Sequence, residues 1–473
     1  MKHGVYVQQQ ATSVSTPVVA PVGIPFVIGA APVQSAAPAP PAGTPVLCTN
    51  WDEAVARLGY SDDWRTYNLC EFMYAHFNLY GCQPVIFCNL LDPESMKTAV
   101  PAADVAVTDR KAFLPAEAVD DDTLVVLPSG GAGSAYVKGT DYGTYYDGGK
   151  LVIEMMPDGA AYGATAVNVA CSVVNPSAVT PSVVAAGLQN IEKCLTATGI
   201  VPDLICAPGY SEDPVVAAVM ATKAAGINGI FRAKALVDIS SAVGGAVSYD
   251  GVLPVKTAGN LTDENQILCW PMLALGDKVF HMSTHLAGLM AQVDTGNGGC
   301  PFESPSNKAF KCNAMVLDGG GEVTLTLEQA NTLNANGVVT ALCFMGSWVC
   351  WGNYTACYPL NTDVKDYFIP VSRMFDWVGN TVVRTFWSKL DKPMRTRLIE
   401  NIMDTCNIWL GGLVGFGYIL GARVEAKENE NPLTDLMAGV IRVHIYVTPP
   451  SPAQEIDFLL EYDISYVKSA LGG

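Results

Sequence analysis

The stretch Asp203-Leu204-Ile205-Cys206-Ala207 is a short apolar run between two segments, 182–198 and 214–225, in which apolar residues recur at helical spacing. A run of this kind predicts a strand, and the flanking periodicity predicts helices. Strands that alternate with helices are typical of a sheet covered by helices. The stretch therefore predicts an α/β fold.

The same alternation extends in both directions along the chain. Asn50 is a suitable N-cap for a helix, because its side chain can accept a hydrogen bond from the first helical turn. The expected elements are strands at 45–49, 84–88, 230–235 and 338–344, and helices at 51–58, 64–80 and 325–336. These elements form one α/β core that is interrupted in the sequence.

The interruption runs from Pro93 to Pro181 and has a different texture. Short β-prone runs at 124–127, 151–155 and 166–174 are separated by Gly, Asp and Asn, and Tyr146-Asp147-Gly148-Gly149 is a strong signal for a hairpin turn. This pattern predicts an inserted β-rich domain.

Extended arms are predicted at both ends of the chain. No Asp, Glu, Lys or Arg occurs between Lys2 and Asp52, and eight prolines in that window exclude a helix and favour an arm that cannot bury itself. After Pro452, residues 455–462 alternate in their first half as a strand does. Unpaired strands are templates for other chains, so we expect these arms to pair with neighbouring subunits. The residues expected to do so are Gly4, Val5, Tyr6, Val7, Ile456, Phe458, Leu460 and Tyr462.

The fold class is therefore α/β, with an inserted β-rich outer domain and extended terminal β-arms. The expected division is an N-terminal arm and lead-in strand (1–45), a discontinuous α/β core (46–92 and 182–366), the inserted domain (93–181), a C-terminal inner domain (367–452) and a C-terminal strand arm (453–473). The inner domain is expected to contain helices at 371–389 and 393–409 and a strand at 439–448.

Composition excludes several classes of protein. The net charge is −18, with 27 Lys and Arg against 45 Asp and Glu, which argues against a nucleic-acid or anionic-membrane binder. The 14 cysteines contain no Cys-x-x-Cys pair, so buried reduced thiols are expected. No secretory signal is expected at the N-terminus. Residues 405–422 are uncharged but rich in glycine, which favours a tightly packed interior segment over a membrane span.

Sequence motifs that could carry chemistry are weak. His281 and His285 have the spacing by which a helix holds a metal ion, but a third ligand and the Glu of a zinc protease are missing. Gly415, Gly417 and Gly421 match a dinucleotide fingerprint only superficially, because no βαβ unit surrounds them. Cys343, Cys350 and Cys357 recur every seven residues, but inert thiols are expected there. We expect no catalytic residue, metal or cofactor.

One segment is basic in this acidic chain. Between 373 and 397 the cations outnumber the acids, and a contact with an acidic protein surface is expected. The six basic residues are Arg373, Arg384, Lys389, Lys392, Arg395 and Arg397.

The chain resembles the tail sheath proteins of contractile bacteriophages and phage-tail-like bacteriocins, especially those of Gram-positive hosts. The resemblance covers most of the chain. It rests on Gly4-Val5-Tyr6-Val7, on 23–32 (Gly-Ile-Pro-Phe-Val-Ile-Gly-Ala-Ala-Pro), on 203–211 (Asp-Leu-Ile-Cys-Ala-Pro-Gly-Tyr-Ser), and on the C-terminal block that opens with 367–374 (Tyr-Phe-Ile-Pro-Val-Ser-Arg-Met).

This resemblance implies a structural protein and no enzyme. Its subunits would form a helical homopolymer of stacked hexameric rings around an inner tail tube and contract to drive the tube through an envelope. The terminal arms would complete sheets in adjacent subunits, and the basic segment would contact the tube. Partners would be the tube, baseplate and tail terminator proteins, with no direct contact to nucleic acid. The protein would be part of a virion tail or a bacteriocin particle, assembled in the bacterial host cytoplasm.

Two alternatives remain at this stage. The first is a cytosolic α/β thiol hydrolase that uses Cys206 beside Pro208 and Gly209. The second is the sheath of a type VI-like secretion machine, although such sheaths are commonly built from two chains.

Overall fold

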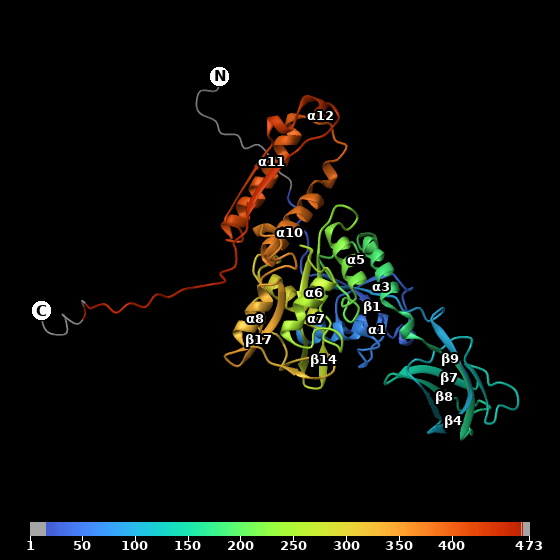
Figure 1. The fold of residues 1–473 in the computed structure, drawn as a ribbon. Helices are drawn as coiled ribbons and strands as arrows, with labels where there is room; N and C mark the ends of the chain where they lie inside the picture. The colour runs from blue at the N-terminus through green and yellow to red at the C-terminus, as the bar shows by residue number, and fades with distance from the viewer. Residues whose placement is uncertain (1–15, 465, 467–473) are drawn as a thin grey trace.

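A computed structural model describes residues 16–464 and 466 (Figure 1). Its centre is an eight-stranded sheet in which all neighbouring strands from β17 to β3 run parallel, while the outermost strands β18 and β2 are antiparallel to their neighbours. In spatial order the strands are β18 (Ser347–Trp351), β17 (Val338–Phe344), β12 (Gln266–Cys269), β11 (Lys234–Asp238), β10 (Leu204–Cys206), β1 (Pro25–Gly29), β3 (Val85–Asn89) and β2 (Pro45–Cys48).

The prediction that the N-terminal window cannot bury itself is wrong for β1. This strand lies in the middle of the sheet, between β10 and β3, and all of its residues are buried. A parallel strand is covered on both faces, so a continuous uncharged run such as Phe26-Val27-Ile28 suits it. Absence of charge was therefore a sign of burial in this part of the chain.

Several core helices begin at a residue whose side chain caps the first turn. The side chain of Asn50 accepts a hydrogen bond from Glu53 N at the start of α1, and that of Asp213 accepts from Val215 N and Val216 N at the start of α5. The core helices are α1 (Trp51–Leu58), α2 (Asn68–Met73), which continues into the π-helix η2 (Tyr74–Leu79), α3 (Pro181–Gly187), α4 (Cys194–Thr198), α5 (Pro214–Ala225), α6 (Tyr249–Ala258), α7 (Met282–Gly296), α8 (Leu327–Asn334) and α9 (Val364–Tyr367). The short 3-10 helices are η1 (Val33–Ser35), η3 (Pro176–Ala178), η4 (Leu188–Lys193), η5 (Trp387–Lys389) and η6 (Glu428–Glu430).

A small antiparallel sheet lies beside the core. Its strands, in order, are β14 (Lys278–Phe280), β13 (Met272–Leu275), β15 (Ala314–Val316) and β16 (Glu322–Val323).

The segment predicted as an insertion forms a sheet of its own at one end of the molecule (Figure 1). The order is β6 (Val125–Pro128), β9 (Ala166–Val174), β4 (Lys97–Thr108), β5 (Lys111–Leu114), β8 (Lys150–Met155) and β7 (Tyr142–Asp147). The side chains of this sheet enclose a separate apolar cluster that includes Leu114, Val126 and Ile153. Val119 and Val174, by contrast, belong to the main core and join the two parts.

The C-terminal helices extend to the opposite end of the molecule (Figure 1). This C-terminal unit consists of α10 (Ile369–Phe386), α11 (Thr396–Gly415), α12 (Leu433–Met437) and a two-stranded ribbon of β19 (Gly421–Glu425) and β20 (His444–Thr448). It has its own apolar cluster around Met374, Trp377 and Leu410, to which Ala20 of the N-terminal segment also belongs.

Candidate assembly site

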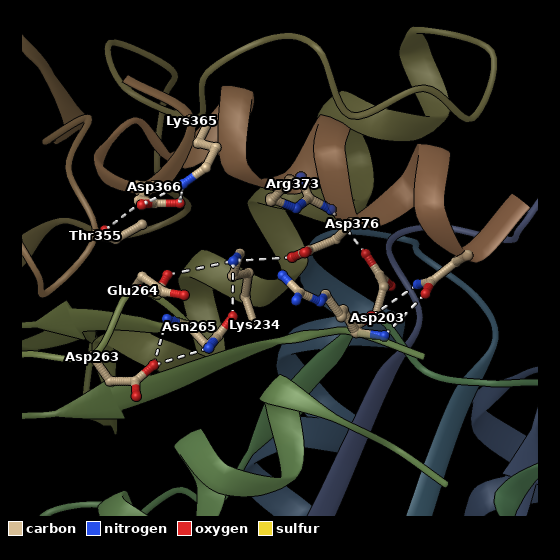
Figure 2. Close-up of polar contacts among 12 residues, drawn as sticks. Asp203, Lys234, Asp263, Glu264, Asn265, Thr355, Lys365, Asp366, Arg373 and Asp376 are labelled. Carbon is tan, nitrogen blue, oxygen red and sulfur yellow. Dashed lines mark hydrogen bonds and ion pairs between the residues drawn. The ribbon is translucent and has the colours of Figure 1, made fainter. Parts of the chain in front are cut away.

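Buried ion pairs join α10 to the amino ends of the core strands (Figure 2). Arg373 Nη2 lies 2.5 Å from Asp294 Oδ2 and 3.0 Å from Asp203 Oδ2, and the Arg373 side chain is only 4% exposed. Asp203 directly precedes β10. Lys234 Nζ, on the first residue of β11, lies 2.9 Å from Asp376 Oδ2. Two ionic contacts from consecutive turns of one helix thus fix the C-terminal unit on the core.

We call this group of Asp203, Lys234, Asp294, Arg373 and Asp376 the joint. The charges in the joint depend on one another. Burial disfavours the charge on Arg373, but the carboxylates of Asp294 and Asp203 outweigh this effect and raise its pKa, so the guanidinium stays protonated. Removing one partner of such a buried pair leaves an uncompensated charge and costs about 3–5 kcal/mol. Loss of any one member of the joint is therefore expected to destabilise it.

Neutral hydrogen bonds extend the joint along α10. Asn380 Oδ1 accepts from Arg232 N at 2.9 Å, and Asn380 Nδ2 donates to Arg232 O at 2.8 Å. Trp377 Nε1 donates to Ala20 O at 2.9 Å. The helix is thus bonded on one side to the core and on another to the N-terminal segment.

That N-terminal segment lies along α10 before it enters the core. Val18 N donates to Thr385 Oγ1 and Ala20 N donates to Thr381 Oγ1, each at 3.0 Å. The predicted arm residues Gly4, Val5, Tyr6 and Val7 lie outside the described residues. Since residues 18–20 are bonded to α10, a free N-terminal arm can include only residues that precede this contact.

The C-terminal arm leaves the body as an extended segment without secondary structure from 449 to 463 (Figure 1). The predicted strand residues Ile456, Phe458, Leu460 and Tyr462 all lie here, and Phe458 and Leu460 are 84% and 97% exposed. The strand predicted at 455–462 is therefore absent from the single chain. A row of exposed apolar side chains of this length is typical of a surface that another chain covers.

The β19–β20 ribbon is the other incomplete element of the C-terminal unit. Its two strands pair from Gly421 with Thr448 to Glu425 with His444, and α11 packs against β19. No third strand joins either edge within the described residues. On β19, Val424 N donates to Asn407 Oδ1 of α11 at 3.1 Å, so α11 covers part of that edge, and the outer edge of β20 is the one left open.

The structure separates the six basic residues of the predicted tube contact. The assignment of Arg373 is wrong, because this residue is buried and neutralised by Asp203 and Asp294. Arg384 and Lys389 are half-buried, whereas Lys392, Arg395 and Arg397, between α10 and α11 and at the start of α11, are exposed. Only this second group of three forms an accessible basic surface.

The residues examined for chemistry have structural surroundings. His281 Nδ1 lies 2.8 Å from Glu71 Oε2, while His285 is buried with Nδ1 2.9 Å from Tyr80 Oη. Within the described residues, no group of three His, Cys, Asp or Glu side chains could hold a metal ion. Burial raises the pKa of the Cys206 thiol well above its ordinary value, which leaves it unsuited to be a nucleophile. The hydrolase alternative loses its expected nucleophile.

The glycines of 411–421 do not pack tightly, contrary to the expectation from sequence. A methyl group placed on Gly411, Gly415 or Gly421 would meet no atom within 4 Å. Gly411 and Gly415 lie on the exposed face of α11, and Gly421 is the half-exposed first residue of β19. Among the described residues, no helix combines the length and apolar character needed to cross a membrane.

Comparison with known proteins identifies a relative of most of the chain. The tail sheath protein of Burkholderia phage BcepMu is 26% identical over 422 residues, which cover 83% of this chain and 84% of the relative. The chain is a homologue of phage tail sheath proteins. No family model matches it.

The fold of this sheath homologue also occurs in solved contractile assemblies. The sheath complex of an extracellular contractile injection system, PVC, in its contracted state has a TM-score of 0.60 at 13% identity, with 98% of this chain and 99% of the other covered. The helical sheath of the anti-feeding prophage, also contracted, has a TM-score of 0.59 at 14% identity, with 97% and 99% covered. The predicted α/β sheath fold is confirmed.

Sequence reasoning missed most of the joint in this sheath homologue. Asp203, Lys234, Asp294, Asp376 and Asn380 were not singled out, because their partners lie far away in the sequence. One signal was available: Asp203 and Lys234 each stand directly beside an apolar strand, where a charge needs a partner.

Proposed function

We propose that the chain is the structural subunit of a contractile tail sheath, which polymerises as stacked hexameric rings around an inner tail tube and contracts to drive that tube through a target envelope. The observation that carries this proposal is the relationship to a phage tail sheath protein over more than four fifths of both chains. No bond is made or broken in this function, so the chain needs no catalytic residue or cofactor.

We further propose that subunits are linked through the C-terminal unit. The exposed row Ile456, Phe458, Leu460 and Tyr462 would add to an open edge of the β19–β20 ribbon of another copy. Main-chain hydrogen bonds would supply affinity, and burial of alternate side chains would set the register. The N-terminal residues Gly4 to Val7 would add in the same way, since the segment that carries them runs along α10 of this unit.

The domain division follows from the same assignment. The core (46–92 and 182–366) and the C-terminal domain (367–452) would surround the tube, with the arms 1–45 and 453–473 as connections, although β1 is a core strand and not part of a free arm. The inserted domain (93–181) would face outward. Tube, baseplate and tail terminator proteins are the proposed partners, in a virion tail or bacteriocin particle assembled in the host cytoplasm.

Electron microscopy tests the polymer. The purified full chain, alone or expressed together with a tail tube protein, should give long tubes in negative stain. A discrete particle under every condition, including in the presence of the tube protein, would contradict the proposal.

The tube contact is tested by charge reversal. In the triple variant Lys392→Glu, Arg395→Glu and Arg397→Glu, we expect weaker assembly on the tube, because the exposed basic surface of three residues would become acidic. Wild-type assembly should weaken as salt rises, since exposed charges are screened beyond about 8 Å at physiological ionic strength. Equal co-sedimentation of wild type and variant with the tube at low salt would remove these residues from the contact.

A further inference from the structure

The hairpin of β17 and β18 ends in an exposed apolar tip. Phe344 pairs with Ser347, so the turn consists of Met345 and Gly346 alone. Both turn residues have positive φ, 49° for Met345 and 83° for Gly346, and such a turn favours Asn-Gly. This backbone conformation is strained for a bulky side chain, and the Met345 side chain is 92% exposed, so no packing within the chain offsets the strain. Strain of this kind is typical of functional positions. We call Phe344 and Met345 the finger.

A small apolar cavity lies between α6 and α8, beside the first residue of β17. Its volume is about 150 Å³, and its wall is almost entirely apolar, with Val252 and Leu253 from α6, Leu333 from α8 and Val338 from β17. Leu253 and Thr332, which also line it, are exposed, so the cavity opens to the surface. An apolar cavity of this size accepts a group as large as a benzene ring. It therefore suits one apolar side chain that enters from outside.

The finger and the cavity lie at opposite ends of the same strand. Val338, in the cavity wall, is the first residue of β17, and Phe344 is the last. The seven residues of the strand span about 20 Å, so the finger cannot reach the cavity of its own chain. A contact between the finger of one copy and the cavity of the next is therefore head to tail. Contacts of this type build rings or helical filaments, depending on whether the rotation closes.

The charges around the finger and the cavity are complementary. Phe310 N donates to Trp348 O of the hairpin at 2.9 Å, and the next residue, Lys311, is exposed beside it. At the cavity, Asp250 belongs to the wall and Glu328 lies on the adjoining surface of α8, and both are exposed. Within the part of the chain that the structure describes, no ion pair involves Lys311, Asp250 or Glu328. Opposite charges on two copies would attract each other across this contact.

We propose that the finger of one copy inserts Met345 into the cavity between α6 and α8 of a second copy, with Lys311 facing Asp250 and Glu328. Methionine suits this position, because its unbranched side chain adapts to irregular apolar gaps. The inference rests on the proposed function, in which copies of the chain form a helical polymer. It adds a direct link between the α/β cores of neighbouring subunits to the link through the arms.

The critical concentration for assembly of the full chain, measured by light scattering, tests the finger. In Met345→Asn we expect it to rise at least about tenfold, because the interface loses a buried apolar anchor. The variant should keep the melting temperature of the wild type or exceed it, since asparagine tolerates the left-handed conformation of this turn. The matched control Val137→Asn replaces an exposed apolar residue of the inserted segment and should assemble like the wild type. Equal critical concentrations for the two variants would overturn the proposal.

Photo-crosslinking identifies the surface that the finger contacts. An amino acid with a short diazirine side chain is incorporated in place of Met345, and tubes are formed from a mixture of isotope-labelled and unlabelled chains. We expect peptides that join position 345 to α6 or α8 of another copy. Crosslinks to the tube protein or to another surface only, or no crosslink in tubes, would overturn the proposal. If the wild type forms no tubes, the sheath function fails, and crosslinking of the concentrated free chain decides the contact by the same criterion.

Discussion

At the scale of single residues, Arg373 decides whether the C-terminal unit stays on the core. In Arg373→Met we expect the free energy of unfolding to fall by about 3–5 kcal/mol, because the carboxylates of Asp203 and Asp294 lose their buried cation. Denaturant unfolding measures this change. Lys392→Met, an exposed position, should stay within about 0.5 kcal/mol of the wild type. Equal stability of both variants would mean that the joint contributes nothing.

Two buried imidazoles predict the response to acid. Burial lowers the pKa of His76 and of His285 to about 3, below the ordinary value near 6.5. Both are therefore neutral in the folded chain, and their contribution to stability is full above pH 6.5 and is lost as the pH falls towards 3. Between pH 7 and pH 5 the loss is about 2 kcal/mol for each imidazole.

The variant His76→Phe should flatten this acid dependence, since it removes one titrating group and keeps an aromatic ring beside Phe72. Unfolding midpoints at pH 5 and pH 7 give the comparison. His281 acts in the opposite direction: its pKa is raised to about 10, so its contribution is full below pH 6.5 and is lost as the pH rises through 10. An unchanged acid slope in the variant would show that His76 is accessible to protons in the folded state.

At the scale of elements, the C-terminal arm can be removed without cost to the single chain. A chain that ends at Pro452 should keep the circular dichroism and melting temperature of the wild type and form no tubes, because residues 455–462 are exposed and belong to no strand of the single chain. Negative-stain microscopy at matched concentration measures assembly. Tubes of normal length would refute strand exchange at this end.

At the N-terminus, we expect a truncation to be harmless only if it ends before residues 18–20, which are bonded to α10. Removing residues 1–15 should leave the fold intact, whereas removal up to Pro21 also deletes Ala20, which is buried against Trp377. We expect the longer deletion to lower the melting temperature and the shorter one to leave it unchanged. The same melting temperature for both deletions would show that the contact with α10 is unimportant.

The inserted sheet should be separable from the core. Asn175 N donates to Met96 O at 2.8 Å, so the two ends of the segment 97–174 already meet. A chain in which a short Gly/Ser linker replaces 97–174 should fold and polymerise, with a small loss of stability from Val119 and Val174. Aggregation of this chain, measured by light scattering, would mean that the segment is part of the main core.

At the scale of the whole molecule, the sequence predicted those helices and strands whose bounds depend on interactions between residues close together in the chain. The bounds of α1 and α5 follow from the caps Asn50 and Asp213, which act within one turn, and those of β17 follow from an apolar run of strand length. The strand expected at 230–235 is displaced to β11 at Lys234–Asp238. Strand β4 was missed because its exposed residues and Pro101 hide the alternation.

The long-range part of the site could not be predicted from a single sequence. Arg373 looked like one basic residue among six, and only the folded chain brings it to Asp203, which is 170 positions away. The position of β1 between two strands from distant parts of the chain is equally non-local. Charge and periodicity describe a segment, but the partner that neutralises or covers it depends on topology.

The hairpin turn at Gly148 and Gly149 lies on the inserted sheet, at the end of the molecule opposite the C-terminal unit (Figure 1). A Cβ atom at either glycine would have open space around it. For anyone who wishes to decorate the particle, this turn is the place to insert a foreign epitope or fluorescent domain. A purification tag fused to either terminus would instead occupy the arms through which we propose that neighbouring subunits pair.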